Sequence, residues 1–158
     1  MDEFRELELP FIPDTGAPNP VLLQTDDSAA LLFGARQLMK DGGPSQVVGN
    51  AVVEFGQCHA TRFGYPNDEA MAGIPRFDGL SYGACEVSNS SWIEEIRQLN
   101  KKSFPDAPYL VNAKHFVFVF HDSTFECVAD GLNVDFNHEL WEQLWPRVYQ
   151  KLLRYAAG

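Results

Sequence analysis

Apolar and polar positions alternate most clearly between residues 114 and 131, where two apolar runs flank a short polar stretch. A period of two places the phenylalanines at 116, 118 and 120 on one face of a strand and the residues between them on the other face. Both faces are largely apolar, so we predict a central strand covered on two sides. The polar stretch predicts a hairpin whose turn is Asp122-Ser123.

This turn fixes which residues face one another across the hairpin. It pairs Phe118 with Cys127, which predicts a core thiol and not a nucleophile. On the opposite face it brings His121 within reach of Glu126 or Asp122. A carboxylate orients a histidine and makes it more basic, so His121 and Glu126 are the candidate catalytic pair. A hairpin with another register lacks this pair, and His121 then only organises the turn.

The second histidine of the hairpin, His115, is expected to face Asp130 in the same register. His115 and His121 are six residues apart along one strand, or roughly 20 Å. That separation is too large for the two imidazoles to share a metal ion or a substrate atom.

Further apolar runs complete the predicted sheet. Two short runs flank an Asp-rich turn and predict a hairpin, and a long β-rich stretch follows them. Its glycines indicate bulges or a bend. The predicted strands outside the first hairpin are residues 21–23, 29–33, 47–63 and 82–87.

Two segments have the helical period instead. Ser91 and Glu94 have the spacing of a capping box, and the helix that they open covers about residues 91–102. The second helix covers about residues 137–156 and has one broad apolar face. Pro146 lies inside it and either kinks the helix or begins a second segment.

Together these elements predict an α+β fold, an antiparallel sheet of about six strands built from hairpins with both helices packed on it. We expect one domain over residues 1–158. Residues 1–19 are punctuated by prolines and predict an extended N-terminal arm. Residues 64–81 have no sustained period and predict a long loop, either a binding loop or lid, or a loop packed by its own side chains.

Charge narrows the classes of partner. Twelve Lys and Arg against 22 Asp and Glu give a net charge of −10. Nucleic acids and anionic membranes need a positive surface, so neither is expected as the main partner. No apolar run reaches the roughly 20 residues of a membrane span. The three cysteines are an odd number, which predicts reduced, buried thiols and a cytoplasmic location.

The remaining candidate residues are few. Arg62 and Arg76 bracket the long loop and, with Asp122, are the candidate ligand-binding residues, because a pair of arginines can clamp an anion. No set of histidines and cysteines has the spacing of a metal site, and no phosphate-binding or dinucleotide motif is present. We therefore expect no metal and no cofactor.

Two functions are consistent with this pattern. The first is a protein-binding module, acting as an accessory or inhibitory factor, whose acidic surface and long loop meet a protein partner. The second is a small-molecule-binding protein or enzyme that uses His121 and Glu126 beneath residues 64–81. A homodimer through the aromatic C-terminal helix is compatible with either.

Overall fold

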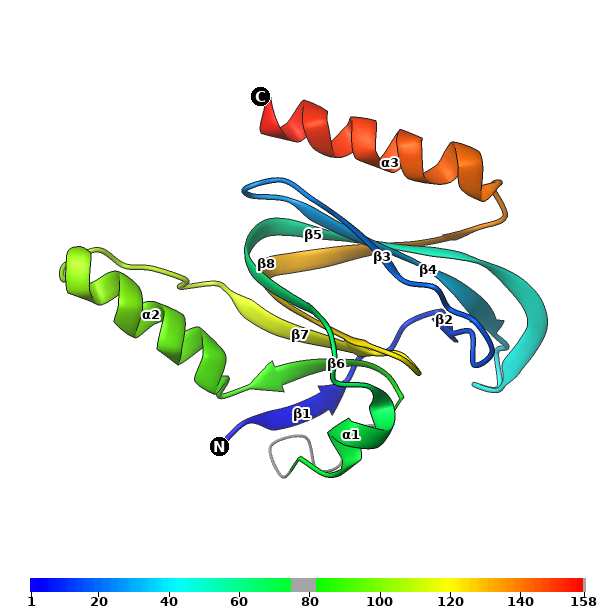
Figure 1. The fold of residues 1–158 in the computed structure, drawn as a ribbon, viewed down its shortest axis with the longest axis horizontal. Coiled ribbons are helices and arrows are strands. Elements are labelled where there is room, and N and C mark those ends of the chain that lie inside the picture. The colour runs from blue at the N-terminus through cyan, green and yellow to red at the C-terminus, as the bar shows by residue number, and fades with distance from the viewer. Residues whose placement is uncertain (75–81, 158) are drawn as a thin grey trace.

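The computed structural model describes residues 1–74 and 82–157. Within them the chain forms an α+β fold with one antiparallel sheet of eight strands and three helices (Figure 1). The class and the antiparallel sheet are as predicted, and the sheet has two strands more than expected. The strands are β1 (Glu3–Glu6), β2 (Phe11–Pro13), β3 (Val21–Gln24), β4 (Ala29–Leu38), β5 (Pro44–Gly64), β6 (Gly83–Ser88), β7 (Lys114–Val119) and β8 (Thr124–Asn137), and the helices are α1 (Asp68–Ala72), α2 (Ser91–Ser103) and α3 (Trp141–Ala156).

The two additional strands lie in the N-terminal arm. The order across the sheet is β1-β6-β7-β8-β5-β4-β2, with β3 paired to β4 beside β2. Both β1 and β2 therefore pair on one side only. An edge strand tolerates a proline, since one side of its backbone needs no ladder hydrogen bond. Pro13 at the end of β2 is accommodated in this way.

The sheet curls around a core of phenylalanines on its inner face. Phe33 on β4 contacts Phe120, at the end of β7, with ring centroids 5.1 Å apart. Strands β8 and β5 lie between β7 and β4 in the sheet, so this contact crosses the interior. Burial of each such ring contributes roughly 1.5–3 kcal/mol. The predicted inner face, with Phe116 and Phe118 on one side of β7, is confirmed.

The outer face of the sheet is covered by three helices at three separate places (Figure 1). The helix α3 packs Leu144, Val148 and Leu152 on apolar residues of β4 and β5. The helix α2 packs Trp92 and Ile93 on Val128 of β8. The short helix α1, inside the predicted loop 64–81, buries Met71 against β6 and β7.

The helix α2 begins at Ser91, as predicted, but its cap and the start of α3 differ from those expected. The residue that caps α2 is Ser90 and not Ser91, since the Ser90 hydroxyl accepts the Ile93 N–H at 3.1 Å. The helix α3 starts at Trp141 because β8 continues through Asn137 on its partner β5. It remains one helix through Pro146.

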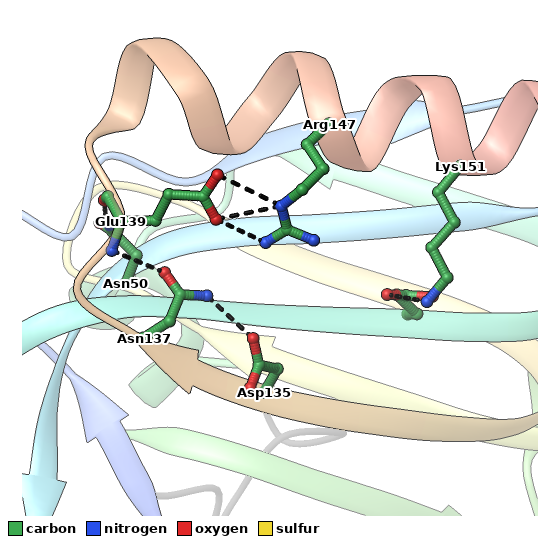
Figure 2. A network of polar contacts seen from close by, with 7 residues as sticks. Asn50, Asp135, Asn137, Glu139, Arg147 and Lys151 are labelled. Atoms are coloured by element: carbon green, nitrogen blue, oxygen red, sulfur yellow. Dashed lines mark hydrogen bonds and ion pairs between the residues drawn. The ribbon is translucent and has the colours of Figure 1, made fainter.

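Polar contacts hold the flank of α3 to the sheet (Figure 2). Arg147 binds Glu139 through two nitrogens, the shortest distance being 2.7 Å, and Asn50 of β5 donates to the Glu139 carbonyl at 2.9 Å. Lys151 reaches Glu54 of β5 at 2.7 Å. The orientation of α3 is thus fixed by charge on one flank and by leucine and valine packing beneath.

The turn of the β7–β8 hairpin corrects the predicted register. The Phe120 N–H donates to the Ser123 carbonyl at 2.8 Å, so the turn is His121-Asp122 and not Asp122-Ser123. Phe118 consequently faces Phe125, and Val117 faces Glu126. Each residue of β7 meets a partner two positions earlier on β8 than expected. A shift of two leaves every side chain on its predicted face but changes its neighbours.

Candidate functional site

In the observed register His115 and His121 each contact a carboxylate other than the one expected. His59, for which no partner was predicted, also contacts a carboxylate. His115 Nε2 lies 2.9 Å from Glu126 Oε2, where Asp130 was expected. Asp130 instead contacts His59 on β5 at 2.9 Å. His121 Nδ1 lies 3.2 Å from an oxygen of Asp68, at the start of α1. The structure therefore separates His121 from Glu126 and forms three histidine–carboxylate pairs, of which those of His115 and His121 belong to larger groups.

The first group is a buried chain of three side chains, Ser90, His115 and Glu126, which we call the buried triad. His115 Nδ1 lies 2.9 Å from the Ser90 hydroxyl, and its Nε2 meets Glu126. Ser90 already accepts the Ile93 N–H, so its own proton is available for Nδ1. A neutral His115 then donates its Nε2 proton to the carboxylate. Every polar atom of the imidazole is satisfied without solvent.

Burial makes this group rigid. The exposed fractions of Ser90, His115 and Glu126 are 8%, 1% and 6%. The Trp92 ring packs edge-on against the His115 ring, with centroids 5.1 Å apart. Ser90 comes from the start of α2, while His115 and Glu126 come from neighbouring strands, so the triad also ties the helix to the sheet.

Arg62 lies close to the buried triad. It faces Glu126 in the β5–β8 register, and its guanidinium lies 4.1 Å from the centre of the Trp92 ring. It also approaches Glu95 of α2 at 3.6 Å. A cation over an aromatic face and a partly exposed ion pair are both weakly stabilising. Arg76 lies outside the described residues.

The second group is exposed. It comprises Asp68 and Glu69 of α1 and His121 and Asp122 of the hairpin turn, which together we call the acidic corner. The Asp68 N–H also approaches the His121 carbonyl at 3.4 Å. The hydrogen bond and charge of Asp68, with further charge from Asp122 and Glu69, raise the pKa of His121 above its ordinary value of 6.5. Asp122, which the sequence predicted as a neighbour of His121, is thus part of the acidic corner.

Two exposed aromatic side chains flank the acidic corner. Phe63, near the end of β5, is 43% exposed, and Tyr65 is 82% exposed. The backbone here is fixed to the hairpin, since Gly64 faces Thr124 and the Thr124 hydroxyl donates to the Pro66 carbonyl at 2.8 Å. These contacts place the exposed rings and the carboxylates of the corner at the same end of the sheet.

The cysteines are buried and free, as predicted. Cys127 lies in the phenylalanine core, with its sulfur 3.6 Å from that of Cys58. The hydrogen bond to Cys58 and burial raise the pKa of Cys127, so this thiol stays protonated. Among residues 1–74 and 82–157, no group of three or more His, Cys, Asp or Glu side chains is placed to hold a metal ion.

Sequence reasoning missed Ser90 of the buried triad and the contact of Asp68 with His121. Ser90 directly precedes the predicted capping box. Moving the predicted cap from Ser91 back by one residue identifies Ser90. No local pattern links Asp68 to His121, because 53 residues separate them. No family model, curated protein or solved structure matches this chain.

Proposed function

We propose that this protein is a binding module that meets a basic protein partner at the acidic corner and its flanking rings. The observation that carries the proposal is the combination at one end of the sheet: Phe63 and Tyr65 are exposed, and three carboxylates lie at the same end. Aromatic residues are enriched in the centres of protein interfaces, while charges at the rim set the approach and the choice of partner.

The net charge supports the same partner chemistry. A charge of −10 accelerates encounter with a positively charged protein and disfavours nucleic acid. His121 adds a pH dependence. Its protonation places a positive charge among the carboxylates, so binding of a basic partner weakens when the pH falls below the raised pKa of His121 and strengthens as the pH rises through it.

The test compares two charge-reversal variants. Glu69→Lys with Asp122→Lys changes the acidic corner, and Asp26→Lys with Asp106→Lys makes the same change of net charge at exposed residues elsewhere. Proteins captured from a lysate by the wild type are identified by mass spectrometry, and the dissociation constant of each purified candidate is then measured. We expect the corner variant to lose binding and the control variant to retain it. Equal loss in both variants would contradict a localised site.

One observation favours a second function, acyl transfer at the buried triad. A serine hydroxyl joined to a histidine that a carboxylate orients is the arrangement of an activated nucleophile. In that reaction Ser90 Oγ attacks an ester carbonyl, its proton passes to His115 Nδ1 and then to the leaving alcohol, and water releases the acid. A polar depression of about 460 Å³ reaches Ser90.

Labelling with a fluorophosphonate tests this second function, because the reagent reacts only with an activated serine. Ser90→Asn removes the nucleophile and keeps a side chain that can cap α2. Ser91→Ala is the matched control. Label on Ser90 that disappears in Ser90→Asn and persists in Ser91→Ala supports acyl transfer. Absence of label from a folded wild type leaves the triad a structural element.

Self-association is a further proposal about partners. Trp145, Tyr149 and Leu153 follow one another along α3 and are 42%, 38% and 39% exposed. Pairing of two α3 helices through this stripe gives a homodimer. Light scattering during size-exclusion chromatography tests it, with Tyr149→Glu expected to give the monomer. A monomeric wild type at high concentration contradicts it.

We also propose a cytoplasmic location, supported by the free thiols of Cys58, Cys85 and Cys127. Fractionation of cells that produce the protein tests this location. No helix among the described residues is long and apolar enough to cross a membrane.

A further inference from the structure

The curled sheet is closed by the N-terminal arm. Strands β1 and β2 are the two ends of the strand order, yet only Leu7–Pro10 separate them in the chain. Four residues span at most about 14 Å. The Leu7 N–H donates to the Ala84 carbonyl of β6, and the Leu38 N–H of β4 donates to the Pro10 carbonyl, both at 2.9 Å. The two ends of the sheet therefore approach each other.

No strand pairing joins these two ends within the described residues, since β1 pairs with β6 and β2 with β4. We call the line along which these two unpaired ends approach each other the seam. A cavity of about 400 Å³ opens along it, between Tyr82 and Gly83 on one side and Leu38 on the other. This volume lies within the range of about 300–1,000 Å³ found for small-molecule sites, which favour the mouths of barrels.

Part of the cavity wall is apolar. Leu7 and Leu9 of the crossing segment pack against the phenylalanine core and remain half-buried. Leu38 and Tyr82 are half-buried opposite them. A side-chain carbon added at Gly83 would meet no atom within 4 Å, so the space beside it is open.

The rim of the cavity is negative. Glu6 and Glu8 line it, both are exposed, and neither forms an ion pair with a described basic residue. Burial, with the charges of Asp14 and Asp68, raises the pKa of Tyr82 to about 12, so the phenol at the cavity stays neutral. Apolar side chains beside two carboxylates that have no cationic partner among residues 1–74 and 82–157 complement a molecule with an apolar body and a positive end.

We propose that the seam binds a small organic cation, a protonated amine with an apolar body. The body lies against Leu7, Leu9 and Leu38, and the ammonium group lies between Glu6 and Glu8. This site is independent of the acidic corner, and either can fail without the other.

The test uses three probes with one body and different ends: phenylbutylamine, phenylbutanol and phenylbutyrate. Affinities are measured by calorimetry, and the site is mapped by NMR shifts of the backbone amides. We expect the amine to bind tightest, the alcohol more weakly and the carboxylate least. The amine should shift the amides of residues 6–9 and 82–84.

Two variants separate the seam from general attraction to an acidic protein. Glu6→Gln with Glu8→Gln removes the negative rim, and Glu3→Gln with Asp26→Asn removes the same charge at exposed residues elsewhere. We expect the rim variant to bind the amine roughly five-fold more weakly, since each exposed ion pair contributes about 0.5 kcal/mol, and to bind the alcohol unchanged. Equal weakening in both variants, equal affinity for all three probes, or no binding of the amine overturns the proposal.

Discussion

His115 and His121 stand at opposite ends of one strand, and each has a carboxylate partner about 3 Å away. The two histidines differ in their exposure to solvent. The side chain of His115 is 1% exposed and that of His121 is 54% exposed. A buried imidazole must satisfy both nitrogens inside the protein, so its partners are structural requirements. An exposed imidazole can exchange its partner for water, so its charge can respond to pH.

The largest effect expected from this contrast is on stability. His115→Ala removes a buried ring and both of its hydrogen bonds, and we expect it to lower the free energy of unfolding by about 3 kcal/mol. His121→Ala removes only exposed contacts, and we expect little change in the free energy of unfolding. Urea denaturation of both variants measures the difference. Equal losses would show that burial does not distinguish the two histidines.

A smaller effect is expected at the start of α2. Ser90→Ala removes the helix cap and the contact with His115, which should cost about 1–2 kcal/mol. Ser91→Ala removes only an exposed hydroxyl that donates to Asp2 at 3.0 Å. We expect its cost to be a few tenths of a kcal/mol. Thermal unfolding ranks the two variants, and the reverse order would assign the cap to Ser91.

Replacement of Arg62 measures how much its side chain, which lies beside the buried triad, contributes to stability. Arg62→Met keeps most of the apolar stem but removes the charge over Trp92 and the contact with Glu95. We expect a loss of about 0.5 kcal/mol, because both interactions are partly exposed. The same urea assay measures it. A loss as large as that of His115→Ala would make Arg62 an essential part of the buried group.

The smallest effect on stability is expected at Asp68. Asp68→Asn removes the carboxylate charge and should return the pKa of His121 toward 6.5. NMR titration of the imidazole detects this change. Protonated His121 is stabilised in the folded chain, so this contribution is complete below about pH 6.5 and is lost as the pH rises through the raised pKa. Asp135→Asn, on β8, is the control and should leave the titration unchanged.

The sequence predicted much of the fold and little of the candidate site. Alternation along residues 114–131 placed Phe118 and Cys127 in one core correctly, because side-chain direction follows from strand geometry alone. The arm was predicted as extended, but its strands β1 and β2 were not. They are four and three residues long and depend on pairing with β6 and β4.

The turn shows why the site was harder to predict. Neither His121-Asp122 nor Asp122-Ser123 has the glycine that favours a two-residue turn, so local preference did not distinguish them. Contacts from elsewhere select His121-Asp122: the Asp68 N–H meets the His121 carbonyl, and Thr124 donates to Pro66. The residues that make these contacts lie more than 50 positions away in the chain.

The pattern of apolar positions is enough to predict the class of fold, the strands and helices with strong periods, and the face to which each residue of the central hairpin points. The register depends on contacts between distant segments, and it pairs Glu126 with His115 and leaves Asp68 as the partner of His121. The physical reason is that a shift of two residues preserves every buried face and so costs nothing in the pattern of apolar positions. Packing between distant segments distinguishes the two registers.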